Sequence, residues 1–276
     1  MLCTRAAIGT LALVGALASA TASATEQQPS QFPDWGGQWE RPQGVGIQWD
    51  QTKRPGLPQH APLTPKYQKL LEWSIADQAA GGQGIDNRYT CIANGMPRMM
   101  AVIEPIEFVI LPNITYVNFE AFLPRRIYTD GRDFPTNQEP SLAGYSIGRW
   151  LDTTGSGRFD TLEVETRNFK GPRTVESTGI PLADDNQTIV KERLFLDKAN
   201  PDLMHNIITI VDGAFTYPWT VDKHYRRERN VLWFEDNCTE NNHHVVIGNE
   251  GYYVSSEGYL MPTRKGQKPP EMRYFK

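Results

Sequence analysis

Thr188 to Leu196, with the sequence TIVKERLFL, decides the fold because its side chains alternate in polarity from one residue to the next. One side carries Val190, Glu192 and Leu194, and the other side carries Lys191 and Arg193. A period of two residues is that of a half-buried β-strand. The stretch therefore predicts a strand with one face against a core and one face in water.

Similar runs recur on both sides of this stretch, from residue 107 onward. They are rich in β-branched and aromatic residues and are separated by turn sequences such as Asp130-Gly131. The expected strands are Glu107–Leu111, Ile114–Ala121, Arg125–Thr129, Tyr145–Leu151, Thr161–Thr166, Thr188–Leu196, Asn206–Val211, Trp219–Arg226 and Val231–Glu235. This series predicts a mainly β fold, an antiparallel meander whose sheet closes into a barrel and so removes its edges.

One helix is expected before these strands. Thr64 is a suitable cap, Pro65 stands at the first helical position, and Gly81-Gly82 ends the pattern. We therefore expect one helix over 63–81, as part of a single barrel domain that covers 63–276.

The first 62 residues divide into a leader and an arm. Met1 to Ala24 has a positive residue, a short apolar run and a small-residue cleavage pattern, which are typical of a secretory signal. The apolar run is too short to span a bilayer as a helix, and no second such run follows. We expect a periplasmic or secreted protein without a membrane span. Residues 25–62 then form an extended arm that packs by its indoles, Trp35, Trp39 and Trp49.

Cys91 and Cys238 are the two cysteines that follow the leader. An oxidising compartment favours a disulfide between them, which would close a loop of about 150 residues. Two unpaired thiols are the alternative.

Charge and aromatic content restrict the class of partner. The net charge is −4 and no basic face is apparent, so nucleic-acid binding is not expected. Aromatic residues make up 11% of the chain, which suits a pocket for a ring-containing molecule as well as a packed core. We take Trp150 and Trp219 as candidates for lining such a pocket.

Glu192 is the first candidate for chemistry, because the alternation places its carboxylate on the apolar side of a strand. Burying a lone charge is costly, so the carboxylate must be paired, neutralised or open to a cavity. One interpretation is a general acid or base with a raised pKa. The other is a structural ion pair with an inward arginine such as Arg126 or Arg149.

Two further groups of polar residues are candidates. Tyr128, Asp130 and Arg132 would gather at one rim, where they could bind the polar end of a substrate, although Asp130-Gly131 is also explained by a tight turn. His243 and Glu240 lie beside Cys238, which would hold their segment in place. Asp130 or His243 would be the second acid–base group, and Glu240 would contact the substrate.

The sequence contains no motif for a metal or an organic cofactor. The five histidines have no zinc-site spacing, and fingerprints for nucleotides or a serine nucleophile are missing. Asp152–Glu163 resembles a calcium loop in spacing, but it should be flanked by strands, so a solvated hairpin loop is favoured. We expect neither cofactor nor metal.

Eight motifs, in order, resemble a family of secreted bacterial proteins that are mostly uncharacterised. They are Asp34-Trp-Gly-Gly-Gln-Trp39, Gly95-Met-Pro-Arg98, Arg126-Ile-Tyr-Thr-Asp-Gly-Arg132, Ser146-Ile-Gly-Arg-Trp150, Asp160-Thr-Leu-Glu-Val-Glu-Thr166, Glu192-Arg193, Phe215-Thr-Tyr-Pro-Trp-Thr220 and Cys238-Thr-Glu-Asn-Asn242. The resemblance implies one β-rich domain with a lipocalin-like barrel outside the cytoplasm, and it carries no activity.

Three functions are consistent with these observations. The first is a barrel that acts on a small apolar or ring-containing molecule by cofactor-free acid–base chemistry, as an isomerase, dehydratase or lyase. In that case Arg132 and Tyr128 would polarise a substrate oxygen. The second is a non-catalytic carrier of a hydrophobic ligand, in which Glu192 pairs fully with an arginine. The third is a carbohydrate-binding or envelope-interaction protein with the arm's indoles exposed. The sequence does not determine the oligomeric state.

Overall fold

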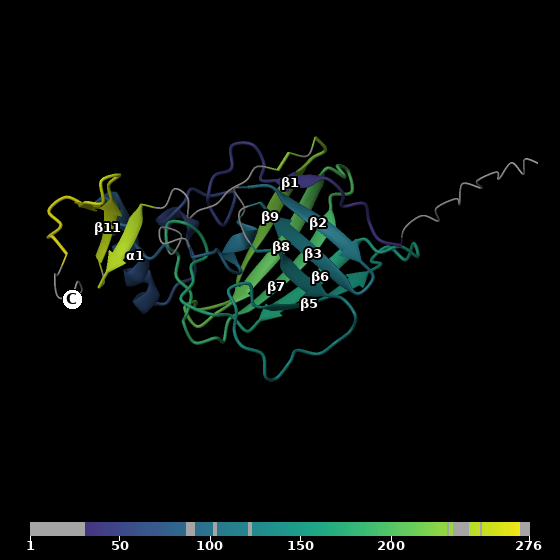
Figure 1. Ribbon diagram of the computed structural model, residues 1–276. Coiled ribbons are helices and arrows are strands. Elements are labelled where there is room, and N and C mark those ends of the chain that lie inside the picture. Colours follow the sequence, from purple (N-terminus) through teal and green to yellow (C-terminus); the bar gives the residue numbers. More distant parts are fainter. Residues whose placement is uncertain are drawn as a thin grey trace, which may run out of the picture. The chain divides into compact units, whose positions relative to one another are not determined.

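The computed structural model describes residues 31–86, 92–101, 104–120, 123–230, 232–233, 243–248 and 250–270, and these form a closed barrel, a smaller sheet and one α-helix (Figure 1). The expected leader, Cys91, Cys238 and Glu240 lie outside the described residues. The barrel strands are β1 (Gln38–Glu40), β2 (Ile106–Leu111), β3 (Ile114–Phe119), β4 (Arg125–Tyr128), β5 (Tyr145–Leu151), β6 (Thr161–Arg167), β7 (Ile189–Leu196), β8 (Leu203–Val211) and β9 (Trp219–Glu228).

The prediction of an antiparallel meander is wrong at one position. Neighbouring barrel strands pair antiparallel everywhere except between β4 and β5, which run parallel, with Ile127 opposite Ser146 and Tyr128 opposite Ile147. A parallel neighbour requires a connection that returns to the end of the sheet where the first strand began. The segment 129–144 makes this return, so the barrel is mixed.

The extended arm supplies the strand that closes the barrel. β1 pairs with β2 on one side and with β9 on the other, with Gln38 opposite both Glu107 and Glu228. The strand expected at 231–235 is not seen in its described residues, Leu232 and Trp233. The three arm indoles are buried, and Trp39 donates a hydrogen bond through Nε1 to the carbonyl of Trp35. The expectation that Trp35, Trp39 and Trp49 form an exposed platform is therefore wrong, because they pack into the core.

The core lies inside the barrel and under the segments that cover its ends. Alternate side chains of the long strands are buried, as the two-residue period requires, and the pattern is clearest in β8 and β9. Buried apolar residues on the barrel strands include Ile106, Phe108, Val117, Ile127, Leu162, Val190, Leu194, Met204, Ile208 and Tyr225. The 3₁₀ turn Arg98–Met100 adds two buried methionine side chains to this core.

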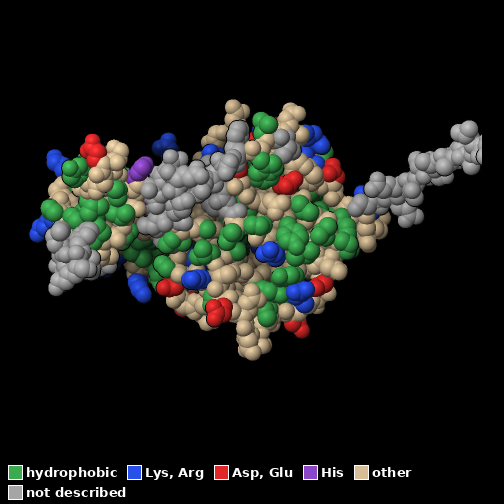
Figure 2. All heavy atoms as spheres, viewed as in Figure 1, with side chains coloured by type: hydrophobic (Ala, Val, Ile, Leu, Met, Phe, Trp, Pro, Cys, Tyr) green, Lys and Arg blue, Asp and Glu red, His purple; other side chains and the backbone are tan. Residues whose placement is uncertain are grey.

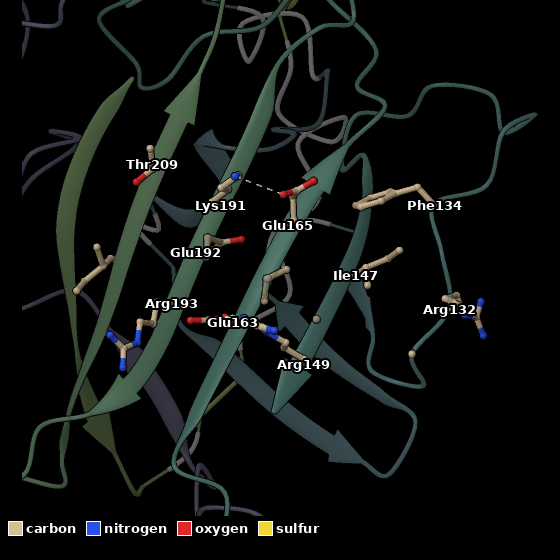
Figure 3. Close-up of a pocket in the computed structure, with 14 residues that line it drawn as sticks. Arg132, Phe134, Ile147, Arg149, Glu163, Glu165, Lys191, Glu192, Arg193 and Thr209 are labelled. Carbon is tan, nitrogen blue, oxygen red and sulfur yellow. Dashed lines mark hydrogen bonds and ion pairs between the residues drawn. The ribbon is translucent and has the colours of Figure 1, made fainter. Parts of the chain in front are cut away.

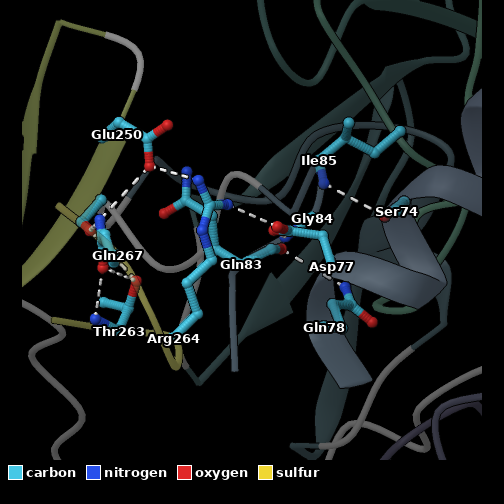
Figure 4. Close-up of polar contacts among 11 residues, drawn as sticks. Ser74, Asp77, Gln78, Gln83, Gly84, Ile85, Glu250, Thr263, Arg264 and Gln267 are labelled. Carbon is cyan, nitrogen blue, oxygen red and sulfur yellow. Dashed lines mark hydrogen bonds and ion pairs between the residues drawn. The ribbon is translucent and has the colours of Figure 1, made fainter. Parts of the chain in front are cut away.

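Helix α1 (Pro65–Ala79) begins at a proline in the first turn, as the sequence predicts, and buries Leu71 and Ser74. The three-stranded sheet contains β10 (His244–Ile247), β11 (Glu250–Val254) and β12 (Leu260–Pro262). Arg264 connects it to the helix by binding Asp77 at 2.6 Å and Glu250 at 2.5 Å (Figure 4). Within the part of the chain that the structure describes, no helix combines the length and apolar character needed to cross a bilayer.

Trp39 should contribute strongly to stability, since its side chain is fully buried in the closing strand and its ring faces the Arg227 guanidinium at 4.6 Å. We expect Trp39→Ala to lower the free energy of unfolding by about 3–5 kcal/mol, the usual cost of removing a buried indole. Trp73→Ala is a matched control because that indole is 52% exposed, and its effect should stay within about 0.5 kcal/mol. Urea denaturation measures both, and equal effects would contradict the role of β1.

Candidate functional site

Glu192 lies inside the barrel, where it forms a bidentate ion pair with Arg125 of β4. Arg125 Nη1 donates to Glu192 Oε1 at 3.1 Å, and Nη2 donates to Oε2. Asn206 of β8 adds a hydrogen bond from Nδ2 to Oε1 at 3.0 Å. Both charged side chains are buried, so the two groups neutralise each other in a region that water does not reach.

The guanidinium of Arg125 has an acceptor for each of its five N–H donors. In addition to Glu192, it donates to Ser146 Oγ at 3.1 Å, to Thr166 Oγ1 at 2.8 Å and to Met100 Sδ at 3.6 Å. Such complete pairing is what a stable buried charge requires. The arrangement matches the structural interpretation of Glu192, and a carboxylate held in this way is poorly placed to accept a proton from a substrate.

The arginine that pairs with Glu192 differs from the two that the sequence suggested. Arg126 is exposed and lies 5.9 Å from the Tyr116 ring, and Arg149 binds Glu163 on the outside at 2.7 Å. The alternation of β4 explains this correction, because Arg125 shares the buried face with Ile127 while Arg126 points outward.

A groove of about 670 Å³ lies on the outer wall of the barrel, across strands β5 to β8 (Figure 3). Its apolar lining includes Phe134, Ile147 and Ile207, and Glu192 borders it without exposing its side chain. Its charged lining residues are Arg132, Arg149, Glu163, Glu165, Lys191 and Arg193. The size is within the range of pockets for small molecules.

The parallel pairing of β4 and β5 produces one wall of this groove. The return segment 129–144 passes beside β5, and it brings Phe134 near Ile147, while Arg132 lies farther along the segment at the border of the groove (Figure 3). Contacts that hold the segment there include Arg132 Nη1, which donates to the Tyr145 hydroxyl at 3.2 Å, and the Arg167 guanidinium, which lies 4.8 Å from the Phe134 ring.

The groove has an excess of positive charge. Glu165 is shared by Lys191 at 3.7 Å and Arg167 at 2.5 Å, and Glu163 is engaged by Arg149. Among the described residues, no carboxylate pairs with Arg193, whose guanidinium lies 5.7 Å from the Phe195 ring. On the barrel face of Figure 2 positive and negative side chains are otherwise interspersed. Arg193 is thus available to an anionic ligand, and Lys191 on the same strand makes only a long contact with a carboxylate that Arg167 binds more closely.

The structure places Tyr128, Asp130 and Arg132 together at the rim of the barrel. Arg132 binds Asp130 through Nη2 at 2.6 Å, and its guanidinium lies 3.9 Å from the Tyr128 ring. The hydrogen bonds from Arg132 hold the pKa of the Asp130 carboxyl below its usual range. The trio is internally paired, and Arg132 alone of the three lines the groove.

The other predicted site residues do not join this groove. Trp150 contacts Trp35 at 4.9 Å between ring centroids, and Trp219 contacts Phe215 at 5.7 Å, so both belong to aromatic packing. His243 precedes β10, and its carbonyl accepts a hydrogen bond from the amide of Val254. The hydrogen bonds found for Glu192 involve neither Asp130 nor His243. The Asp152 carboxylate accepts hydrogen bonds from the backbone amides of Ser156 and Gly157 in the loop that follows it, as in a hairpin turn.

Sequence reasoning missed Lys223, a lysine whose charged end is buried inside the barrel. Its Nζ donates to the carbonyl of Trp49 at 2.7 Å and lies 4.6 Å from the indole ring of the same residue. Burial lowers the pKa of Lys223 to about 7. The alternation of β9 gave a usable signal, because Lys223 shares its face with Val221 and Tyr225.

Comparison of the chain with family models, with curated proteins and with solved structures gave no match. The resemblance to secreted bacterial proteins therefore stays a prediction that rests on the eight motifs.

Removal of the Glu192 charge should destabilise the protein, since Arg125 would then be buried without a counter-charge. We expect Glu192→Gln to lower the free energy of unfolding by about 3–5 kcal/mol. Glu163→Gln is the control, because it breaks the exposed pair with Arg149 and should cost less than about 1 kcal/mol. Denaturant titration at neutral pH provides the comparison, and a Glu192→Gln variant as stable as the control would contradict the structural role.

Lys223 should make stability increase with pH. Its pKa is about 7 in the native protein and near 10.5 when unfolded, so between these values only the unfolded chain holds the proton. From pH 7 to pH 9 the native protein should gain about 2 kcal/mol relative to Lys223→Met, in which this titration is lost. Urea titrations at both pH values measure the difference. Lys191→Met, at an exposed position, should keep the pH dependence of the unsubstituted protein, and an identical slope in Lys223→Met would contradict the assignment.

Proposed function

We propose that this protein binds a small amphipathic anion, without chemical conversion, in the groove on the outer wall of its barrel. The observation that carries the proposal is the combination of Phe134, Ile147 and Ile207 with the cationic side chains of Lys191 and Arg193. An apolar body would lie along the strands, and a carboxylate, sulfonate or phosphate would contact the cations. A concave, mostly apolar site with a few charged groups is typical of small-molecule binding.

Binding is favoured over acid–base catalysis by the state of Glu192. A general base needs a lone pair within reach of the proton that it removes. Both oxygens of Glu192 accept hydrogen bonds from Arg125, and Asn206 adds a third donor. The carrier hypothesis expects this complete pairing with an arginine. Conversion by an isomerase, dehydratase or lyase would require Glu192 to break that network first.

Two expectations from the sequence accompany this proposal. A lipocalin-like character agrees with a closed barrel, although the parallel β4–β5 pair differs from an antiparallel meander. Export to the periplasm or beyond would give such a carrier access to molecules outside the cytoplasm. Both follow from the motifs and the leader, and they stand as proposals.

Two dyes of similar shape test the binding proposal. 8-Anilinonaphthalene-1-sulfonate carries an anionic group, and N-phenyl-1-naphthylamine does not. We expect Lys191→Glu combined with Arg193→Glu to raise the Kd of the sulfonate about tenfold or more, which is a loss of about 1.4 kcal/mol of binding free energy. The Kd of the neutral dye should change less than twofold. Phe134→Ala should weaken binding of both dyes because the apolar wall is lost.

A matched control separates local charge from net charge. Arg158→Glu combined with Lys170→Glu makes the same change in net charge at exposed positions that do not line the groove. Fluorescence titration should give unchanged dissociation constants for this variant. Equal weakening in both double variants, or no weakening in either, would refute the groove as the binding site.

A further inference from the structure

Three potential metal ligands meet on the outer face of β8 and β9. His205 of β8 lies directly opposite His224 of β9, and Asp222 precedes His224 by two residues on the same face. The Asp222 Oδ2 atom lies 2.9 Å from His205 Nδ1 and 3.2 Å from His224 Nε2. One donor atom from each of the three residues lies within 4.8 Å of the other two.

One ring nitrogen of this cluster has no hydrogen-bond partner among the described residues. His224 Nε2 is shielded from solvent and makes no hydrogen bond, because its approach to Asp222 has the distance but not the direction of one. A buried polar atom without a partner calls for an explanation in a native protein. A cation bound between the two rings and the carboxylate would satisfy this atom.

A second layer of contacts fixes the ring of His205. It stacks on Phe195 with centroids 5.0 Å apart and an interplanar angle of 1°. Its other nitrogen, Nε2, lies 3.5 Å from Asp197 Oδ2. Backbone amides of Ala199 and Asn200 donate to the Asp197 carboxylate at 2.9 and 2.8 Å. A histidine that binds a metal through one nitrogen commonly directs the other to a carboxylate in this way.

The geometry points to a surface site for a divalent transition-metal ion of the zinc class, with His205 Nδ1, His224 Nε2 and an Asp222 oxygen as ligands. Two imidazoles and one carboxylate are a donor set that suits Zn²⁺, and they bind Co²⁺ and Ni²⁺ through the same atoms. In a tetrahedral zinc site, bonds of about 2.0–2.1 Å separate the donor atoms by about 3.4 Å, and the Asp222 oxygen already lies 2.9 and 3.2 Å from the two ring nitrogens. Three protein ligands leave the fourth position for water or another molecule. This site does not depend on the proposed function.

Protons compete with the metal at the same atoms. Without an ion, the hydrogen bond between His205 Nδ1 and Asp222 requires a proton on the ring nitrogen or on the carboxylate. Binding of a metal ion through these atoms displaces that proton. The guanidinium of Arg226, two residues after His224, is engaged by Glu40 at 3.2 Å and is thereby partly neutralised.

Equilibrium dialysis of the chelator-treated full chain against Zn²⁺, followed by measurement of bound metal, tests the site. We expect one ion per chain, lost in Asp222→Asn and in His205→Gln combined with His224→Gln. Asp197→Asn should weaken binding about tenfold or more through the second layer. His243→Gln, which changes an exposed histidine outside the cluster, should bind like the unsubstituted protein.

Two readouts identify the ligands directly. Co²⁺ should give a visible absorption band in the unsubstituted protein that Asp222→Asn abolishes. Addition of Zn²⁺ should shift the ring-proton resonances of His205 and His224, which requires no variant to fold. Unchanged resonances, or Zn²⁺ retained in full by the His205→Gln, His224→Gln variant, would overturn the proposal.

Discussion

The guanidinium of Arg125 and the carboxylate of Glu192 share the inside of the barrel, and the arrangement of the strands around them follows from that pair. Two buried charges are tolerated only when their remaining donors and acceptors are satisfied. The partners come from β5, β6, β8 and the 3₁₀ turn, so these four segments must be in place together with β4 and β7, which carry the pair itself. A slip of β7 by one residue would turn Lys191 and Arg193 inward and Glu192 outward, and Arg125 would then be buried beside other cations without its counter-charge. The pair therefore selects the register of the wall.

The ion pair and the apolar core fill the interior of the barrel, and the groove lies on the outer wall. In this barrel the connection that makes one parallel strand pair also raises a ridge along β5, and the groove lies beside that ridge. The connection contributes Phe134 to the apolar lining, and the outward side chains of Ile147 and Ile207 on β5 and β8 supply the rest. The wall thus has two faces with different roles: the inner face fixes the structure, and the outer face presents chemical groups.

Parts of this arrangement can be predicted from the sequence because they depend on local pattern. Strand β5 has the predicted bounds, and the inward position of Glu192 follows from simple alternation. Strand β1 was missed because it is three residues long and lies among Gln, Pro and Gly residues, where no period can develop. The partner of Glu192 was missed because Arg125 begins a short strand, where the phase of the alternation is hard to fix.

Features that depend on pairing between distant segments could not be predicted. Alternation is the same in parallel and antiparallel strands, so it does not reveal that β4 and β5 run in the same direction or that 129–144 returns along the wall. Likewise, His205 and His224 face each other only because of the register between β8 and β9, and no zinc-type spacing in the chain signals their approach.

The pairing between β1 and β9 affects the order in which the parts of the barrel fold. The side-chain amide of Gln38 binds the carbonyl of Leu232, a partner 194 positions away, beside the rungs that join these two strands. Contacts between such remote segments form late in folding, because closing the long loop between them costs conformational entropy before the contact adds stability. On the ribosome, β1 can pair with β2 early, but the seam between β1 and β9 cannot close until β9 has emerged. Until then the backbone groups that join these two strands in the finished barrel have no partner across the seam, and a chaperone or transport factor could bind them.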